Sequence, residues 1–361
     1  MQGDPALRLL QWFRQVARPF PWREAFPRDP YWTLVAEVML QQTQATRATQ
    51  AWERFLAAFP TLHHAAAARE EELLVPFSGL GYYRRARLLH AACRALAQRG
   101  SWPRTAAELR RLPGIGPYTA AALSAFCFGG EDPPVDGNIL RIASRVLALP
   151  DPARTPASRR AAEALARSLH AAAPSPEVWE ALMELGARVC RPKAPHCPSC
   201  PLATVCKARA EGVPAAYPRP TSSRPVEEAV WVALWVTNHA GAVLLQRVPR
   251  GLLLAGLWLP PLRPLAAPED DPSTAARQLA HSLGLAGPLR PLPPVRHAIT
   301  HRRITVLPFA VAEGCLRAAE TLDDRRWELP QAPTLATSSL LAKLARAAEP
   351  GAARPRPAHG G

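Results

Sequence analysis

The stretch LPGIGPYTAAALSAFCFGGEDPPVDGN, residues 112–138, indicates how a functional site is built in this chain. It begins with a tight turn, Gly114-Ile115-Gly116. Pro117 then stands where the first residue of a helix tolerates a missing N–H. A glycine turn that leads into a helix N-terminus presents backbone N–H groups to an anion. The apolar helix ends at Gly129-Gly130, and the chain continues to Asp136. We therefore expect an acid close to a bound anion.

The composition is that of a basic globular protein. The 361 residues are enough for two or three domains with separate cores. The formal net charge is +15, and arginine carries nearly all of the positive charge, because lysine occurs only at Lys193, Lys207 and Lys343. This balance favours a polyanionic partner such as nucleic acid, since phosphate neutralisation releases counterions. A basic protein without such a partner is the alternative.

The sequence also predicts the compartment. The N-terminal residues 1–15 are typical of a short amphipathic helix and not of a signal peptide. No apolar run approaches the roughly 20 residues that a membrane span needs. Seven cysteines, an odd number, fit a reducing compartment better than a secreted disulfide framework. We expect a cytoplasmic protein with no membrane partner.

Periodicity divides the chain into parts. Residues 1–212 are mostly helical, with apolar residues spaced by three and four, as in Leu7–Val16 and Ile139–Leu147. Residues 213–228 are proline-rich at first and are predicted to be a linker. Residues 229–347 combine strand-like runs with a helix at Ser273–Leu283, which predicts a small α+β domain. Residues 348–361 are predicted to be a flexible tail.

Four cysteines, Cys190, Cys197, Cys200 and Cys206, follow the spacing C-x6-C-x2-C-x5-C. Thiolates that lie so close together in a reducing compartment usually hold a metal centre. Zinc sites more often use two C-x2-C pairs, and only one is present. We therefore predict one [4Fe–4S] cluster, with zinc as the alternative. The remaining cysteines, at positions 93, 127 and 315, are expected to be structural thiols.

Two acids can share the chemistry of one site. Glu37 flanks the apolar stripe of a predicted helix, where partial burial would raise its pKa and let it donate a proton near neutrality. Asp136 would stay ionised and stabilise a developing cation. Cleavage of a glycosidic bond through an oxocarbenium-like state requires this division of labour. A helical glutamate considered alone is usually a surface residue.

A third motif, GLGYYRRAR at residues 79–87, places aromatic residues on a glycine turn beside three arginines. Such a loop could wedge or stack a base while arginines hold phosphates. Considered alone, it would more simply be a core tyrosine beside a solvated basic helix start.

Together these motifs resemble the helix-hairpin-helix superfamily of DNA glycosylases, and within it the adenine DNA glycosylase (MutY) family. The resemblance rests on EVMLQQTQ, GLGYYRRAR, LPGIGPYTA, VDGN and the four-cysteine spacing, and it continues into the C-terminal domain. It implies an all-α glycosylase core with an iron–sulfur lobe, followed by an α+β Nudix-like domain. It also implies a bacterial, nucleoid-associated protein that acts as a monomer on double-stranded DNA.

The resemblance assigns roles to individual residues. Glu37 would protonate adenine at N7, and Asp136 would stabilise the sugar oxocarbenium ion. Asn138 would orient this acid or the attacking water, and Tyr118 would close the pocket near Glu37. The positions that line the adenine pocket of the family are Trp22, Arg23, Leu40 and Glu180. Those that enter the duplex are Gln42, Thr43, Leu80 and Tyr82. Gly114 and Gly116 would bind a backbone phosphate.

Tyr118 has a further implication. In relatives that also cut the strand, this position is a lysine that forms a Schiff base. Because residues 1–192 contain no lysine, the reaction is expected to end at an abasic site.

The C-terminal domain resembles a Nudix fold that has lost its chemistry. Residues 277–285, RQLAHSLGL, keep the frame of the Nudix signature but replace its three acids, so Mg²⁺-dependent hydrolysis is not expected. In the family this domain recognises 8-oxoguanine through a Phe-Ser-His loop. The corresponding residues here are Ile299, Thr300 and His301, so lesion recognition is expected without the aromatic ring.

The sequence thus predicts a monofunctional enzyme of base excision repair that flips out adenine mispaired with 8-oxoguanine or guanine. Three alternatives remain: a thymine-excising or strand-cleaving relative, a non-catalytic DNA-binding protein, and a Nudix hydrolase. Retention of both Glu37 and Asp136 disfavours the second. Gln278, His281 and Ser282, in place of the acids, disfavour the third.

Overall fold

The structure is a computed structural model that describes residues 3–24, 26–220, 225–267, 269–285, 287–311, 324–330 and 334–349. The chain divides into two compact units. The first comprises Met1–Ala68 and Arg84–Ser222, and the second comprises Arg69–Tyr83 and Ser223–Gly361. Among the described residues, no helix combines the length and the apolar character that crossing a membrane requires.

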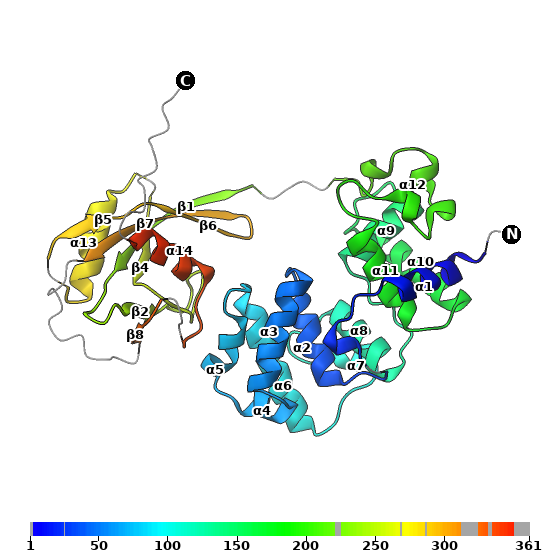
Figure 1. Ribbon diagram of the computed structural model, residues 1–361, viewed down its shortest axis with the longest axis horizontal. Coiled ribbons are helices and arrows are strands. Elements are labelled where there is room, and N and C mark those ends of the chain that lie inside the picture. Colours follow the sequence, from blue (N-terminus) through cyan, green and yellow to red (C-terminus); the bar gives the residue numbers. More distant parts are fainter. Residues whose placement is uncertain are drawn as a thin grey trace. The chain divides into compact units, whose positions relative to one another are not determined.

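The first unit is helical, as predicted (Figure 1). Its α-helices are α1 (Pro5–Val16), α2 (Pro30–Leu40), α3 (Ala45–Ala58), α4 (Leu62–Ala67), α6 (Tyr83–Arg99), α7 (Ala106–Leu109), α8 (Pro117–Phe128), α9 (Gly137–Val146), α10 (Pro156–Ala172), α11 (Glu177–Arg188) and α12 (Lys207–Ala210). Its 3-10 turns are η1 (Pro21–Arg23), η3 (Cys197–Ser199), η4 (Ala203–Val205) and η5 (Pro214–Ala216).

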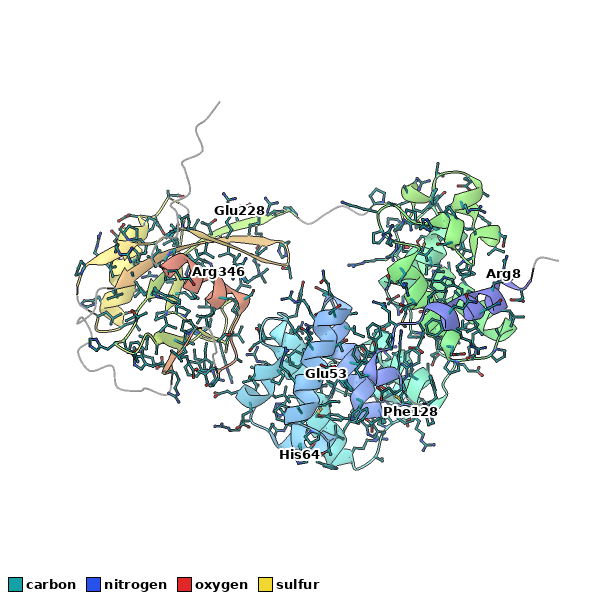
Figure 2. The ribbon with its side chains drawn as sticks, viewed as in Figure 1. Arg8, Glu53, His64, Phe128, Glu228 and Arg346 are labelled. Carbon is teal, nitrogen blue, oxygen red and sulfur yellow. The ribbon has the colours of Figure 1, made fainter. Side chains whose placement is uncertain are left out.

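Several of these helices begin at residues whose side chains cap the first turn. The carboxylate of Asp29 accepts a hydrogen bond from the N–H of Trp32 at the start of α2. The hydroxyl of Thr155 likewise accepts one from the N–H of Ser158 at the start of α10. Such caps satisfy N–H groups that the first turn leaves unpaired. The periodicity did not predict α10, because its buried residues include a serine and two alanines and only one large apolar side chain, Leu169. Side chains extend from the helices of this unit toward neighbouring helices and outward (Figure 2).

The helix-hairpin-helix turn lies between α7 and α8. Gly114 has φ +71°, and a Cβ at this position would lie 2.4 Å from the Cβ of Leu88 on α6. Gly116 is the N-cap residue of α8 and Pro117 is its first residue. The turn therefore needs a glycine at position 114 for both its backbone conformation and its packing.

The second unit is the predicted α+β fold (Figure 1). Its elements are α5 (Glu70–Leu74), η2 (Val75–Phe77), β1 (Glu227–Trp235), β2 (Val243–Arg247), β3 (Trp258–Leu259), β4 (Leu262–Pro264), α13 (Pro272–Ser282), β5 (Leu289–Pro291), β6 (Val295–Ile299), β7 (Arg302–Val311), β8 (Arg325–Glu328) and α14 (Ser339–Ala348). One sheet has the order β4-β1-β7-β5, and β6 also pairs with β7. The other has the order β3-β2-β8.

The second half of strand β1, residues 231–235, is buried on both faces. It runs parallel to β7, with Trp231 opposite Val306 and Ala233 opposite Pro308. Because successive residues of a strand point to opposite faces, Trp231 belongs to the core that includes Leu340 and Leu344 of α14, whereas neighbouring positions belong to the core with α13. Burial on both faces explains why this strand is an almost continuous apolar run.

Residues 69–83 belong to the second unit through specific contacts. Glu71 pairs with Arg247 at 2.8 Å. The N–H of Thr337 donates to the hydroxyl of Ser78 at 3.3 Å, and the hydroxyl of Tyr83 donates to the carbonyl of Thr337. Tyr83 thus connects the loop GLGYY, residues 79–83, to the strand-bearing part of the chain.

The predicted linker begins with ordered residues. Tyr217 is buried, and the guanidinium of Arg145 donates to the carbonyls of Pro214 and Tyr217 at 2.9 and 3.0 Å. Strand β1 begins at Glu227. These contacts attach residues 214–217 to the helical unit. The predicted tail lies outside the described residues from position 350 onward, and so does Cys315.

Candidate active site

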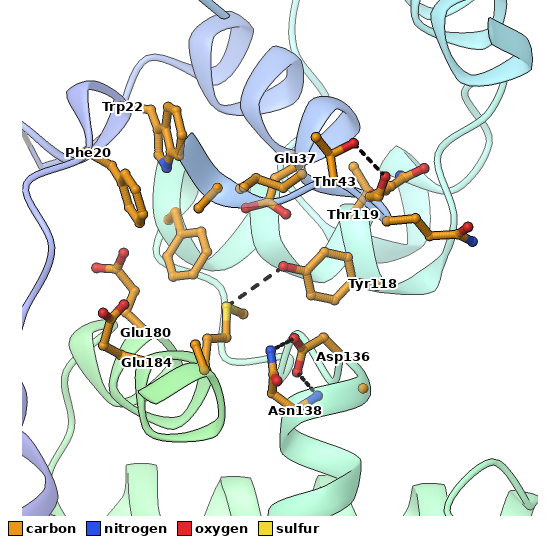
Figure 3. A pocket seen from close by; sticks show the side chains of 18 of the residues that line it. Phe20, Trp22, Glu37, Thr43, Tyr118, Thr119, Asp136, Asn138, Glu180 and Glu184 are labelled. Carbon is orange, nitrogen blue, oxygen red and sulfur yellow. Dashed lines mark hydrogen bonds between the residues drawn. The ribbon is translucent and has the colours of Figure 1, made fainter. Parts of the chain in front are cut away.

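The helical unit contains a cleft of about 820 Å³. The loop and helices from η1 to α11 line it, and they bring together residues that are far apart in the sequence (Figure 3). The predicted site residues among its lining are Trp22, Arg23, Glu37, Leu40, Gln42, Thr43, Gly114, Gly116, Tyr118, Asp136, Asn138 and Glu180.

Glu37 is a buried acid in the wall of this cleft. It lies on α2 and is 6% exposed, and its Oε2 has no hydrogen-bond partner among the described residues. Burial raises its pKa to about 7, because removal from water disfavours the charged form. The hydroxyl of Tyr118 and the positive charge of Arg28 oppose this rise, while Asp136 and Glu180 add to it. A carboxyl in this state can donate a proton near neutral pH.

Asp136 is held in place as the N-cap residue of α9. Its Oδ1 accepts the N–H groups of Asn138 and Ile139 at 2.9 and 2.8 Å, and its Oδ2 accepts the side-chain amide of Asn138 at 2.7 Å (Figure 3). Burial raises the pKa of Asp136 above its ordinary value, and these hydrogen bonds and the charge of Arg141 limit the rise. Hydrogen bonds that favour the ionised form keep this carboxylate suited to facing a cation.

A short chain of contacts connects Asp136 with the cysteine-rich lobe. Arg141 donates to the amide oxygen of Asn138 at 2.8 Å and to the carbonyl of Gly186 at 2.8 Å. Its Nε donates to the carbonyl of Cys190 at 2.7 Å. The orientation of Asp136 therefore depends on where this lobe packs against α9.

Tyr118 lies between the two acids. It is the second residue of α8, and its hydroxyl contacts the sulfur of Met183 at 3.8 Å (Figure 3). Burial raises the pKa of Tyr118 well above its ordinary value, and the carboxyl groups of Glu37 and Asp136 add to this effect. The phenol therefore stays neutral and can donate a hydrogen bond.

One wall of the cleft is a network of charges that the sequence reasoning found only in part. Glu180 pairs with Arg23 and with Arg28, each at 2.6 Å. Glu184 pairs with Arg18 at 2.6 Å and with Arg23 at 3.5 Å. The spacing of Glu180 and Glu184 by four residues places them on one side of α11 and is the signal that could have revealed the second acid.

Gln42 and Thr43 lie at the rim of the cleft, after the end of α2. Gln42 has φ +55°, which is uncommon for a residue with a side chain. Arg85 donates to the carbonyl of Met39 at 3.0 Å and to the hydroxyl of Thr43 at 2.8 Å. The prediction that the arginines of the 79–87 motif hold phosphates is therefore wrong for Arg85. It is buried and binds the carbonyl groups at the end of α2.

The four cysteines line a second cavity. Its wall comprises Cys190, Cys197, Cys200 and Cys206 together with apolar residues of α9 and α11. Among the described residues, no group of three or more His, Cys, Asp or Glu side chains is arranged to hold a single metal ion. Four thiols in the wall of one cavity provide a complete donor set for a metal centre. The donor set is the one that iron–sulfur clusters use.

Arg145 supports the loop that carries these cysteines. This side chain is 2% exposed, and it donates to the sulfur of Cys190 at 3.2 Å and to the carbonyls of Arg191 and Pro192 at 2.8 and 3.1 Å. Cys93 and Cys127 are buried elsewhere, and burial raises their thiol pKa values to about 12 and about 11. Such thiols stay protonated, as expected of structural cysteines.

Two groups of predicted residues belong to the second unit. Leu80 and Tyr82 lie on the 79–83 loop, and Tyr82 is 42% exposed with φ +54°. Thr300 and His301 form the turn between β6 and β7. Thr300 has φ +55°, and His301 contacts Glu227 through its Nε2 at 2.9 Å.

Of the stretch 277–285, which is predicted to resemble a Nudix signature, residues 277–282 lie on α13. Gln278, at the position of one missing acid, accepts a hydrogen bond from Arg263 at 3.1 Å.

Comparisons with known proteins place these features in one family. Residues 35–167 match the HhH-GPD superfamily of base excision DNA repair proteins. The chain is 33% identical to the adenine DNA glycosylase of Rattus norvegicus over 88% of this chain and 72% of that protein. It is 39% identical to the adenine DNA glycosylase of Mycolicibacterium smegmatis over 58% of this chain and 71% of that protein.

A solved structure is also similar. A thermostable thymine-DNA glycosylase superimposes on 57% of this chain and 95% of its own, with 25% identity and a TM-score of 0.52. The chain belongs to the adenine DNA glycosylase (MutY) family of the HhH-GPD superfamily, the N-glycosidases of base excision repair that act on adenine in DNA.

Proposed function

We propose that the chain releases adenine mispaired with 8-oxoguanine or guanine, and that Glu37 and Asp136 perform the chemistry. The observation that carries this proposal is the buried Glu37, whose pKa is about 7, in the same cleft as Asp136. A proton donor and an anion on two sides of one cleft are what dissociative cleavage of a glycosidic bond requires. The adenine must leave the base stack to reach them.

The reaction begins with proton transfer. Protonated Glu37 donates to N7 of the flipped adenine, and this converts the base into a better leaving group. The bond between C1′ and N9 then breaks, its electron pair goes to the base, and an oxocarbenium ion forms at the sugar. The hydroxyl of Tyr118 contributes by holding the Glu37 carboxyl, as its effect on the pKa of that group supports.

Asp136 acts on the sugar. Its two oxygens are fixed by three N–H donors, so the negative charge is in place before the cation forms. Water adds to C1′, and its surplus proton passes to a carboxylate of the cleft. The products are free adenine and an abasic site. Asn138 is a positioning residue, because it holds Asp136 on one side and is held by Arg141 on the other.

Recognition of the base involves the charged wall of the cleft. Glu180 offers a carboxylate, which accepts a hydrogen bond from the amino group of adenine but is repelled by the carbonyl at the same position of guanine. Trp22 is stacked on Phe20 with a ring separation of 4.9 Å and supplies an aromatic wall. Leu40, Gln42 and Thr43 complete the lining and its rim.

DNA is held through its backbone and through the partner base. The turn at Gly114 and Gly116 precedes the N-terminus of α8, where backbone N–H groups favour a phosphate. Leu80 and Tyr82 enter the duplex from their loop. Thr300 and His301 recognise the 8-oxoguanine, and the contact of His301 with Glu227 sets the orientation of its ring.

Cys190, Cys197, Cys200 and Cys206 would hold one [4Fe–4S] cluster. When bound, the cluster would brace the lobe that packs against α9. Two arginines beside it connect this lobe with the rest of the helical unit. Arg145 holds the cysteine loop through its carbonyl groups, and Arg141 connects the carbonyl of Cys190 with Asn138. Zinc is the weaker alternative, because zinc sites more often use two C-x2-C pairs and only one is present here.

The test is single-turnover base release from duplexes that contain A·8-oxoG, A·G or T·G. We expect adenine release from the first two and no thymine release from the third. Glu37→Gln and Asp136→Asn should slow release by about 10²–10⁴-fold, as loss of acid–base or electrostatic catalysis does. Glu53→Gln, an exposed acid of α3, is the control. Release of thymine but not adenine, or full activity of both variants, contradicts the proposal.

A second assay separates lesion recognition from catalysis. In the full chain, Thr300→Ala and His301→Ala should reduce the preference for A·8-oxoG over A·G and leave adenine release from A·G nearly unchanged. An unchanged preference in both variants would mean that these residues do not recognise the lesion.

A further inference from the structure

Arg28 stands out among the charged groups of the cleft because it is almost completely buried. Its side chain is 4% exposed, yet it carries a full positive charge. The residue lies just before α2, the helix that carries Glu37. Burial of a guanidinium is costly, and it is retained where the charge is compensated and used.

The surroundings of Arg28 fix its orientation. The guanidinium lies over the ring of Phe126 on α8 at 4.7 Å and over the ring of Phe26 at 5.0 Å. The N–H of Arg28 donates to the carbonyl of Phe126 at 3.2 Å. Two aromatic faces and one backbone bond leave the side chain little freedom, so its charged end points to a defined place.

The guanidinium of Arg28 points to Oε2 of Glu180. Arg23 contacts Oε1 and Arg28 contacts Oε2, both at 2.6 Å, so each oxygen of the carboxylate has a cation of its own. Arg23 is also shared with Glu184. Among the residues that the structure describes, Arg28 pairs with Glu180 and with no other acid, so the direction of this carboxylate depends on Arg28.

Arg28 also acts on Glu37. The groups that shift the pKa of this acid come from separate elements: Tyr118 of α8, Asp136 at the start of α9, Glu180 of α11, and Arg28 itself. Arg28 is the cation of this set, and it favours the ionised form of Glu37. An acid with too high a pKa transfers its proton poorly, and the best donor has a pKa near the working pH.

We propose that Arg28 is a positioning residue with two effects: it fixes Glu180 toward the adenine, and it places a buried positive charge in the wall of the cleft that also holds Glu37, the proton donor. This inference rests on the proposed role of Glu37 as the general acid. One buried cation thus connects recognition of the base with its protonation.

The experiment is the pH profile of single-turnover adenine release from an A·8-oxoG duplex, measured for the parent, Arg28→Met and Arg28→Lys. In Arg28→Met the alkaline limb should move to higher pH by about half a unit or more, because loss of the cation raises the pKa of Glu37. The plateau rate should fall at least tenfold, because Glu180 is no longer held and Glu37 is a weaker acid. Arg28→Lys keeps the charge, so the limb should stay while the plateau falls.

Arg18→Met is the matched control. It removes a cation from the same network, but Arg18 pairs with Glu184 and is not among the groups that shift the pKa of Glu37. Its alkaline limb should coincide with that of the parent. Helical circular dichroism and DNA affinity show whether each variant is folded, and Arg28→Lys serves if Arg28→Met does not fold.

The outcomes are distinguishable. If the parent shows no alkaline limb near pH 7, the acid role of Glu37 fails. If the parent has this limb and folded Arg28→Met retains it unchanged, the role of Arg28 fails while that of Glu37 stands. If only Arg28→Lys folds, a plateau equal to that of the parent overturns the orientation of Glu180 by Arg28.

Discussion

Gly186 of α11 packs directly against Asn138 of α9. A Cβ on Gly186 would lie 2.4 Å from the Cβ of Asn138 and 2.9 Å from its Cγ. Real Cβ atoms do not approach other atoms so closely, so the glycine is needed for α9 and α11 to meet at this point. Asn138 in turn donates to Asp136 at 2.7 Å. The absence of a side chain at position 186 therefore helps to fix the carboxylate of Asp136.

We expect Gly186→Ala to slow adenine release by about tenfold or more, because a displacement of about 1 Å at a reacting group can cost this much. The added methyl group must push Asn138 away from Asp136. Gly137→Ala adds the same group where no atom lies within 4 Å, so it should slow release less. Single-turnover rates measure both, and equal rates for the two variants would contradict the prediction.

The rate of adenine release should depend on pH with two limbs. The pKa of Glu37 is about 7, and the acid form is active, so the rate should fall as pH rises through about 7. Asp136 must be ionised, and its pKa is raised above the ordinary range, so the rate should also fall in acid. A pH series of single-turnover rates checks this, and a rate that keeps rising above pH 8 would contradict it.

Glu37 should reduce the stability of the fold at alkaline pH. A carboxyl whose folded pKa is about 7 and whose ordinary value is 4.5 binds its proton more tightly in the folded state, so stability is lost as pH rises from about 4.5 to 7. The difference amounts to about 3 kcal/mol at pH 8. Glu37→Gln should therefore unfold at higher urea concentration than the parent at pH 8 and show much less difference at pH 5. A gain of the same size at both pH values would argue against a buried acid.

The enzyme should not form a covalent adduct with the sugar. Tyr118 stands in the cleft where strand-cleaving relatives have a lysine, and the chain has lysines only at positions 193, 207 and 343. Borohydride should therefore trap no protein–DNA adduct during adenine release, because reduction requires a Schiff base. A trapped adduct in stoichiometric amount would overturn this expectation.

Arg145 should matter more for folding than for chemistry. Arg145→Met leaves the carbonyls of Arg191, Pro192, Pro214 and Tyr217 without this donor, which should cost on the order of 3 kcal/mol. The urea midpoint and the iron retained on purification should both fall. Arg167→Met, which breaks an exposed pair with Asp132, should cost less than about 1 kcal/mol. A midpoint for Arg145→Met that matches this control would show that the contacts do not support the lobe.

The sequence predicted the elements whose pattern is local. The stripes of α1 and α9 and the turn before α8 follow from spacing and from glycine and proline chemistry. Helix α10 was not predicted because small residues such as Ser158, Ala162 and Ala166, which make up most of its buried side, contribute little to an apolar pattern. Strands β3, β4 and β5 are two or three residues long and depend on their pairing partners more than on their own residues.

What the sequence by itself determined is the identity of the functional groups: two acids, a tyrosine in place of a lysine, four closely spaced cysteines and a glycine turn. The pKa values and the contacts of these groups were decided only by the tertiary structure. The pKa of Glu37 depends on burial and on four groups from other segments, and the role of Arg85 depends on the carbonyl groups it meets at the end of α2. Arg28 gave no signal in the sequence, because an arginine beside an aspartate is normally solvated. The fold removes Arg28 from water. Its electrostatic interaction with Glu180 and Glu37 is stronger there, because the effective dielectric constant is lower than in water.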